Sequence, residues 1–224
     1  MLTLINNGPS PYGRKVMVAL REKGLEHELQ WDIPWHSDSV VPEHNPLEQL
    51  PILISEDGEA IYDSSFILDW LEAVYPEPSL SPDTSEGRLA VGRLRVLSNG
   101  LVAALGLANF ELSRPEDKRS GQWLARQIRK INGSLRALDG MIGVGPFAVA
   151  DRLTLADIEV GCVVGQLDFI AGNIPPLRNF FEEHVDWRSS CLELSAYIDQ
   201  LMERESFQST LPFPVEMDFD SVTA

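Results

Sequence analysis

The chain has 224 residues, of which 44% are hydrophobic and 23% charged, a composition typical of a soluble globular protein of one or two domains. Its formal net charge of −16 argues against nucleic acid or a membrane surface as a partner, because a polyanion is repelled unless a local basic patch intervenes. Cys162 and Cys191 form no CxxC pair, so neither a disulfide framework nor a dithiol redox motif is indicated. Without a leader pattern or an apolar run of about 18 residues, we expect a cytoplasmic protein that has no spanning helix.

The first part of the chain alternates between strand and helix patterns. The expected elements are a buried strand at 1–6, a helix at 11–23, a strand at 28–33, a loop with room for one short helix at 34–50, a hairpin at 51–55 and 59–62, and a helix at 64–75. This order predicts an α/β domain at 1–77, followed by a proline-rich linker at 78–83.

The part after the linker carries almost only helical patterns, which predicts an all-α domain at 84–208. The expected helices are 86–112, one begun by the capping-box spacing of 113–116 and ending near 141, 155–169, 176–185 and 190–204. Thr154 and Asp157 have the spacing of a structural helix cap. Residues 209–224 are expected to be an acidic tail that is either extended or disordered.

Ser10 is the first candidate for chemistry, because it follows a strand and a tight turn and precedes Pro11 at an expected helix start. Strand, turn and helix N-terminus together form a corner that attracts anions. Arg14 and Lys15 lie near the same helix start, where cations oppose the helix dipole. They are therefore expected either to serve an anion or to pair with carboxylates on a solvated face. The four histidines lack ligand spacing, so no metal site is expected.

Four motifs together resemble the glutathione S-transferase superfamily, most closely its bacterial YibF-like members, whose first motif reads Ser-Pro-Phe or Ser-Pro-Tyr. The motifs are Ser10-Pro11-Tyr12-Gly13-Arg14-Lys15-Val16, Asn45-Pro46-Leu47-Glu48-Gln49-Leu50-Pro51, Asp63-Ser64 and Leu153-Thr154-Leu155-Ala156-Asp157-Ile158. The resemblance implies a thioredoxin-like N-terminal domain that binds glutathione and an all-helical C-terminal domain that contributes to an electrophile pocket between the two. It also implies a homodimer and a role in detoxification.

The resemblance further implies roles for individual residues. A cis Leu50–Pro51 bond would present the Leu50 backbone to the cysteinyl part of glutathione. Ser64 would bind the γ-glutamyl carboxylate, Asp63 the α-amino group and Gln49 the glycyl carboxylate. The alternative for Asp63 and Ser64 is a helix cap, and for Gln49 a surface loop position. Glu48 stands where family members often have glycine, and its charge lies near an anionic ligand.

Ser10 is expected to stabilise the glutathione thiolate with its hydroxyl. One hydrogen bond to a charged group contributes roughly 1.5–3 kcal/mol, which would lower the thiol pKa by about one to two units. The alternatives are that Ser10 is only a helix cap, or that Tyr12 is the donor. Tyr12, Trp35 and Phe110 are candidates for an electrophile pocket, against the alternative of core or interface packing.

The predicted function is conjugation of glutathione to a small apolar electrophile, with glutathione as co-substrate and no metal. No cysteine stands at position 10, which argues against thiol transfer through a mixed disulfide with the enzyme. The alternative function is a non-catalytic glutathione-binding or protein-interaction module of the same fold, which Glu48 and the acidic first domain favour. Residues 1–77 carry 14 acidic and four basic residues, a net charge of −10.

Overall fold

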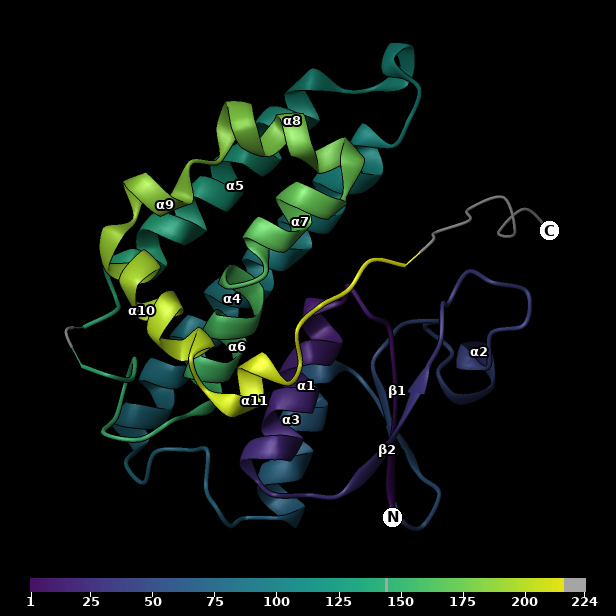
Figure 1. The fold of residues 1–224 in the computed structure, drawn as a ribbon, viewed down its shortest axis with the longest axis vertical. Coiled ribbons are helices and arrows are strands. Elements are labelled where there is room, and N and C mark those ends of the chain that lie inside the picture. The colour runs from purple at the N-terminus through teal and green to yellow at the C-terminus, as the bar shows by residue number, and fades with distance from the viewer. Residues whose placement is uncertain (144, 216–224) are drawn as a thin grey trace. The chain divides into compact units, whose positions relative to one another are not determined.

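The computed structural model describes residues 1–143 and 145–215, which divide into two compact units. The first unit contains Met1–Leu80 together with the chain from Ser206 onward, and the second runs from Ser81 to Glu205. Figure 1 shows the sheet of the first unit and the helices of the second. The last nine residues of the expected acidic tail, 216–224, lie outside the described residues.

The first unit contains a four-stranded sheet in the order β2-β1-β3-β4. Its elements are β1 (Leu2–Asn6), α1 (Pro11–Glu22), β2 (His27–Trp31), α2 (Val41–His44), β3 (Ile52–Ile54), β4 (Ala60–Ile61), α3 (Ser64–Val74) and α11 (Glu205–Gln208), which begins one residue before the boundary. β1 pairs in parallel with β2, and β3 pairs antiparallel with both β1 and β4. The expected element order is therefore confirmed as a mixed α/β unit.

Helix α1 is the central helix of this unit, with nearly every residue of its first ten buried. Val16, Val18 and Leu20 have no solvent exposure, and neither does Leu4 on β1. A helix buried on most of its circumference needs apolar residues all round, or polar residues whose groups are satisfied inside the protein. The edge strand β2 is by contrast largely exposed, as its polar sequence requires.

The second unit is helical in its described part. Its elements are α4 (Ser85–Leu112), the 3-10 helix η1 (Glu116–Lys118), α5 (Gly121–Asp139), α6 (Leu155–Val164), α7 (Leu167–Asn173), α8 (Pro175–His184), α9 (Trp187–Ser190) and α10 (Leu192–Met202). The long helix α4 packs against α5 and α6 through a buried face that includes Leu94, Leu101 and Leu105. Leu89, in the first turns of α4, is exposed.

Of two helix starts predicted in this unit, the structure confirms one and contradicts the other. The Thr154–Asp157 cap is confirmed: Asp157 accepts the Thr154 N–H and hydroxyl at 2.7 Å each, and also the Tyr197 hydroxyl at 2.5 Å. The expected helix start at 113–116 is wrong, because only a 3-10 turn follows it. α5 begins later, where Ser120 Oγ accepts the Trp123 N–H at 3.2 Å. A serine three residues before a helical donor satisfies the cap better than the proline-containing box does.

By length and apolar composition alone, α4 would suffice to cross a membrane. Core helices of soluble proteins meet the same two criteria, and α4 packs on two neighbouring helices in its own unit. Arg95 on α4 also forms an ion pair of 2.7 Å with the buried Glu159 on α6, which links these two helices.

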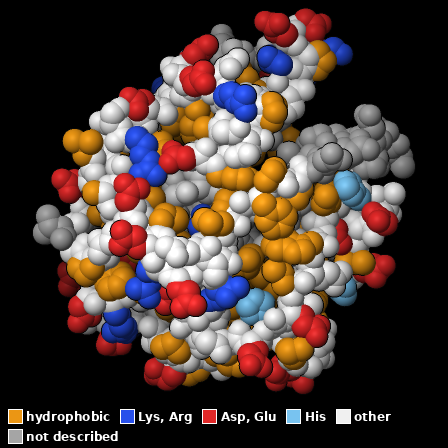
Figure 2. Space-filling model, in the orientation of Figure 1, with side chains coloured by type: hydrophobic (Ala, Val, Ile, Leu, Met, Phe, Trp, Pro, Cys, Tyr) orange, Lys and Arg blue, Asp and Glu red, His pale blue; other side chains and the backbone are white. Residues whose placement is uncertain are grey.

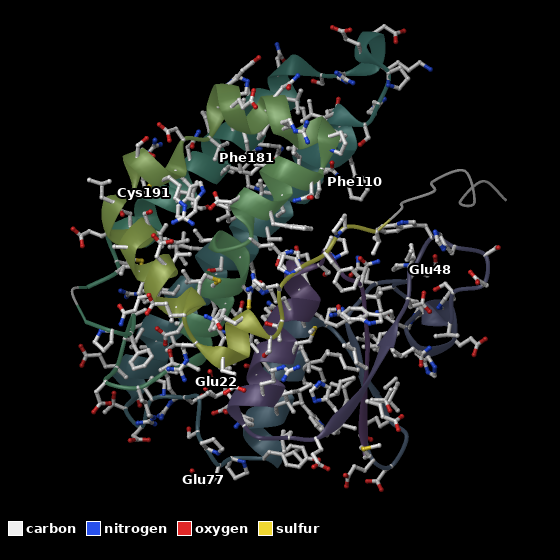
Figure 3. The ribbon with its side chains drawn as sticks, in the orientation of Figure 1. Glu22, Glu48, Glu77, Phe110, Phe181 and Cys191 are labelled. Atoms are coloured by element: carbon white, nitrogen blue, oxygen red, sulfur yellow. The ribbon has the colours of Figure 1, made fainter. Side chains whose placement is uncertain are left out.

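The end of the chain groups with the first unit, including 206–208, which the sequence assigned to the helical domain. Phe207 is fully buried there, and its carbonyl oxygen accepts a hydrogen bond from the Arg14 guanidinium at 3.1 Å. The Ser206 hydroxyl donates to Glu22, which Figure 3 labels at the end of α1. Contacts with residues almost two hundred positions away decide this grouping, and no local pattern contains them.

Candidate functional site

Three chain segments meet at the edge of the sheet that is formed by the end of β1, the start of β3 and the end of β4. β1 ends at Asn6, and the chain continues from there to Ser10 at the start of α1. Ile52, the first residue of β3, pairs with Ile5 near the end of β1, so Pro51 lies beside the loop that leads to Ser10. The first two of the sequence-predicted segments therefore converge because of strand register.

The third segment reaches the same edge through β4. Ile61 pairs with Leu53 near the start of β3, and the antiparallel direction carries the chain on to Asp63 and Ser64 at that edge. α1 and α3 then run side by side in the same direction. Lys15, near the start of α1, donates to Ser65 at the start of α3 at 3.3 Å, and Lys23, after the end of α1, donates to the Tyr75 carbonyl after the end of α3 at 2.7 Å.

Two helix N-termini therefore point to the same edge. Each N-terminus carries backbone N–H groups without helical partners and the positive end of a helix dipole, so the edge favours negative charge. Pro11 occupies the first turn of α1, where the missing N–H of proline costs nothing.

Ser10 is the N-cap of α1, with its Oγ accepting the Gly13 N–H at 3.3 Å. This cap uses one lone pair of the hydroxyl oxygen and leaves the O–H proton available for donation. The cap role and a donor role are thus compatible, although the sequence presented them as alternatives.

Asp63 is the N-cap of α3, and its Oδ1 accepts the Ser65 N–H at 2.6 Å. The sequence allowed Ser64 to fill this position, but Ser64 is the first helical residue, and only 2% of its surface is exposed. The Asp63 side chain is exposed, so its carboxylate can receive a cationic group.

Tyr12 lies half-buried between these groups. Burial, and then the Asp63 carboxylate, raise the pKa of the Tyr12 phenol above its ordinary value of 10.0, so the phenol keeps its proton at physiological pH. The Lys15 ammonium lies 5.7 Å from the centre of the Tyr12 ring, within the range of a cation–π contact. Tyr12 is therefore a hydrogen-bond donor at this edge as well as an apolar surface.

The peptide bond between Leu50 and Pro51 is cis, as expected. The Leu50 side chain packs against the core cluster formed by Ile5, Val41 and Ile52. The turn before it is held by the buried Asn45, whose Nδ2 donates to the Gln49 carbonyl at 2.8 Å. The Gln49 side chain itself is exposed.

Glu48 has a backbone φ of 51°, in the left-handed region that glycine adopts without cost. Glycine, which the resemblance implies at this position, would adopt this conformation without strain. The Glu48 side chain is exposed on its loop, where Figure 3 labels it.

Of the two alternatives for Arg14 and Lys15, a role with an anion or a place on a solvated face, the second is wrong, because both residues are buried. Lys15 has no exposed surface, and Arg14 is held by the Phe207 carbonyl and stacks 5.9 Å from the Phe207 ring centre. The one signal in the sequence was their position at a helix start, where a cation needs compensation. Ser65 and Asn45, which organise the two loops, carried no comparable signal.

The remaining candidates belong to other segments of the chain. Trp35 is half-buried in the first unit, after β2. Phe110 belongs to the second unit, on α4, and is exposed there (Figure 3). Among residues 1–143 and 145–215, no group of three or more His, Cys, Asp or Glu side chains is arranged to hold a metal ion.

Comparison with known proteins supports the family resemblance of the sequence motifs. Residues 9–74 match the model of the glutathione S-transferase N-terminal domain, and residues 121–200 match that of the C-terminal domain. The chain is 31% identical to the uncharacterised GST-like protein YibF of Escherichia coli K12, over 94% of this chain and 98% of YibF.

Solved structures agree. A glutathione S-transferase from Methylobacterium radiotolerans, in complex with glutathione sulfonate, superimposes with a TM-score of 0.88 at 42% identity, covering 97% of each chain. A second, from Methylobacillus flagellatus with glutathione bound, gives 0.85 at 30% identity and covers 95% of this chain and all of the other. The α/β unit and the helical unit are the thioredoxin-like and all-helical domains of one architecture. The chain belongs to the glutathione S-transferase family.

Proposed function

We propose that the chain is a glutathione transferase, in which the thiolate of glutathione, stabilised by Ser10, attacks a small apolar electrophile. The observation that carries the proposal is the convergence of the Ser10 cap, the cis Leu50–Pro51 turn and the Asp63 cap at one edge of the sheet. Relatives of the same fold, at 42% and 30% identity, have been solved with glutathione sulfonate and with glutathione.

Glutathione fits this edge by charge. Its thiol would lie at the N-terminus of α1, where the helix dipole and the Ser10 hydroxyl both favour the thiolate. Its γ-glutamyl carboxylate would bind at Ser64 and the N-terminus of α3, with the α-amino group on the Asp63 carboxylate. The Leu50 side chain is turned into the core, which leaves the Leu50 backbone to bind the cysteinyl part. Gln49 would reach the glycyl carboxylate.

The electrophile would contact aromatic side chains, of which Tyr12 and Trp35 are the candidates in the first unit and Phe110 in the second. The chemistry needs no covalent bond to the protein. Water exclusion and positioning of the thiolate next to the electrophile would supply most of the rate.

The test measures glutathione binding by calorimetry and conjugation of a chromogenic electrophile by absorbance, for the wild type and for Ser10→Ala. Loss of one hydrogen bond to a charged group predicts that kcat/KM falls about 10- to 150-fold. Glutathione binding should change much less, because the carboxylate contacts remain. Unchanged turnover in Ser10→Ala would exclude Ser10 as the donor, and Tyr12→Phe would then be the variant to measure.

Three further variants separate the cap of Ser10 from its donor role. Ser10→Thr keeps the hydroxyl and should retain most activity. Ser10→Gly removes the hydroxyl while remaining an acceptable N-cap, so it should lose activity as Ser10→Ala does. Ser120→Ala removes an equivalent serine cap from α5 and should lower stability by about 1 kcal/mol without touching glutathione binding.

The alternative is a glutathione-binding or protein-interaction module without useful turnover. Its support is the exposed Glu48 carboxylate in the turn before the cis bond, near the expected glycyl carboxylate. Glutathione binding without conjugation of any electrophile would favour this alternative. Glu48→Gln should then raise the affinity for glutathione. If neither the wild type nor Glu48→Gln binds glutathione, both the transferase and the glutathione-binding module are overturned.

A homodimer and a cytoplasmic location are parts of the same proposal. Apolar side chains stand exposed on α3 and on α4, as expected of helices that pack against a second copy. They are Phe66, Val74, Leu89 and Val96. Sedimentation of the purified chain at the mass of a monomer would contradict the dimer.

A further inference from the structure

The C-terminal arm, residues 209–215, runs across the first unit in an extended form after α11 (Figure 1). Phe213 anchors it. The Phe213 ring lies edge-on to Trp31, with ring centres 4.8 Å apart, and covers Gly8 so closely that a Cβ atom there would stand 2.5 Å from a ring carbon. The Phe213 ring can pack at this position only because residue 8 is a glycine and has no side chain.

A pocket of about 380 Å³ lies between the arm and the end of β2. Its volume falls within the roughly 300–1,000 Å³ that small-molecule sites occupy. Part of the wall is apolar and includes the two rings just described. The apolar lining residues are Trp31, Ile33, Val40, Phe213 and Val215. Figure 2 shows hydrophobic side chains gathered on this face of the first unit.

The charged groups of the pocket have one sign. Asp32 and Asp38 line it, and no lysine or arginine is among the lining residues. The Asp32 carboxylate is held in place because its Oδ2 accepts the Val40 N–H at 3.0 Å. Its Oδ1 is shielded from solvent and has no hydrogen-bond partner among the described residues, and the same holds for Nε2 of His36.

An acceptor that is buried without a partner lowers stability, so a ligand that brings a donor to it gains binding free energy. A carboxylate accepts most strongly from a charged donor. Trp31 adds an aromatic face, which attracts a cation by its quadrupole. Acidic oxygens and aromatic rings in one pocket are the chemistry that recognises an organic ammonium ion.

We propose that this pocket binds a small organic cation, with its ammonium group at Asp32 and Asp38 and its apolar body against Trp31 and Phe213. The two carboxylates disfavour an anion in this pocket. The occupant would lie next to the loop that carries Ser10, since Gly8 also lines the pocket. The proposal concerns binding alone and does not depend on the transfer chemistry.

The test uses three probes of similar size on the full chain: 2-phenylethylammonium, the neutral 2-phenylethanol and the anionic 3-phenylpropionate. Binding is followed by tryptophan fluorescence and by calorimetry at low salt. The ammonium should bind up to about fivefold tighter than the alcohol, because one partly exposed ion pair contributes up to about 1 kcal/mol. Its affinity should fall as salt is raised. Equal affinity of the ammonium and the alcohol would overturn the proposal.

Variants assign the site. Asp32→Asn keeps an oxygen for the Val40 N–H and removes the charge, so it should reduce the ammonium preference while the chain stays folded. Asp38→Asn should act in the same direction, and Phe213→Ala should weaken all three probes. Asp57→Asn, an exposed carboxylate in the hairpin turn, is the matched control and should change nothing.

Full ammonium preference in both Asp32→Asn and Asp38→Asn would refute the assigned pocket. A failure of the protein to bind glutathione would leave these results unchanged, so the two proposals fail separately.

Discussion

Replacing Lys23 by methionine should destabilise the first unit more than replacing any exposed residue of α1. The Lys23 side chain has no exposed surface, and its ammonium lies 2.5 Å from Glu72 on α3. It also donates to the carbonyls of Tyr75 at 2.7 Å and Pro78 at 3.0 Å. One cation thus joins the ends of two parallel helices to the first residues of the linker.

The magnitude follows from what the substitution leaves behind. Removing one partner of a buried ion pair costs about 3–5 kcal/mol, because the other charge stays buried without compensation. The Glu72 side chain is 13% exposed and keeps the Leu80 N–H as a donor at 3.1 Å, which places the expected loss at the lower end, about 3 kcal/mol. For a chain of this size that corresponds to a fall in Tm of about 6–12 °C.

The assay is urea and thermal unfolding followed by circular dichroism. Arg21→Met is the control, because Arg21 is an exposed cation in the last turn of the same helix and should cost about 0.5 kcal/mol. The double variant Lys23→Met with Glu72→Gln should recover part of the loss, since no unpaired charge remains. If Lys23→Met and Arg21→Met unfold within 1 °C of each other, the reasoning is refuted.

Three further predictions rest on single contacts. Gly13→Ala should destabilise the chain by about 3 kcal/mol in urea unfolding, because its Cβ would lie 1.5 Å from Asn6 Oδ1. Tyr12 should be less ionised at pH 10 than an exposed tyrosine in an ultraviolet titration, since burial and a nearby carboxylate raise its pKa. The unfolded chain releases that proton near pH 10, so stability should fall as pH rises beyond it, and less in Tyr12→Phe. Asp157→Asn should cost about 3 kcal/mol, because the amide cannot accept from all of the Asp157 donors, among them both groups of Thr154.

Each of these has a control. Gly92→Ala lies on α4 with open space around its Cβ and should be neutral or slightly stabilising, as alanine is in most helices. Asp63→Asn should lower the pKa of Tyr12, because it removes the second cause of the shift. Asp186→Asn replaces a carboxylate at the start of another helix in the second unit and should cost less than Asp157→Asn. Equal losses at both aspartates would contradict the buried-acceptor argument.

Local patterns predicted most of the fold. Strand and helix order followed from periodicity, and helix starts followed from short polar residues at Ser10, Asp63 and Thr154. The start of α5 was misplaced because a capping-box spacing at 113–116 competed with the serine at 120, and only three-dimensional context selects between two caps.

The groups that hold the candidate site together were harder to predict. Lys15 and Lys23 are charged residues on a helix, a pattern that normally indicates a solvated face. Their acceptors, Ser65 and Glu72, lie about 50 residues further along the chain. Burial of a cation depends on such distant partners, and single-sequence patterns contain no information on them.

The first unit is assembled from both ends of the chain, and this has a consequence for synthesis. At roughly 5–20 residues per second, the ribosome completes Phe207 about 6–25 seconds after Leu80. During that interval both α11 and the arm are missing, so Gly8 lacks the Phe213 ring that covers it and Arg14 lacks the Phe207 carbonyl. Helix α11 and the arm therefore complete the first unit only at the end of synthesis. A chain released before Phe207 would leave Gly8 uncovered and Arg14 without the carbonyl that accepts its hydrogen bond.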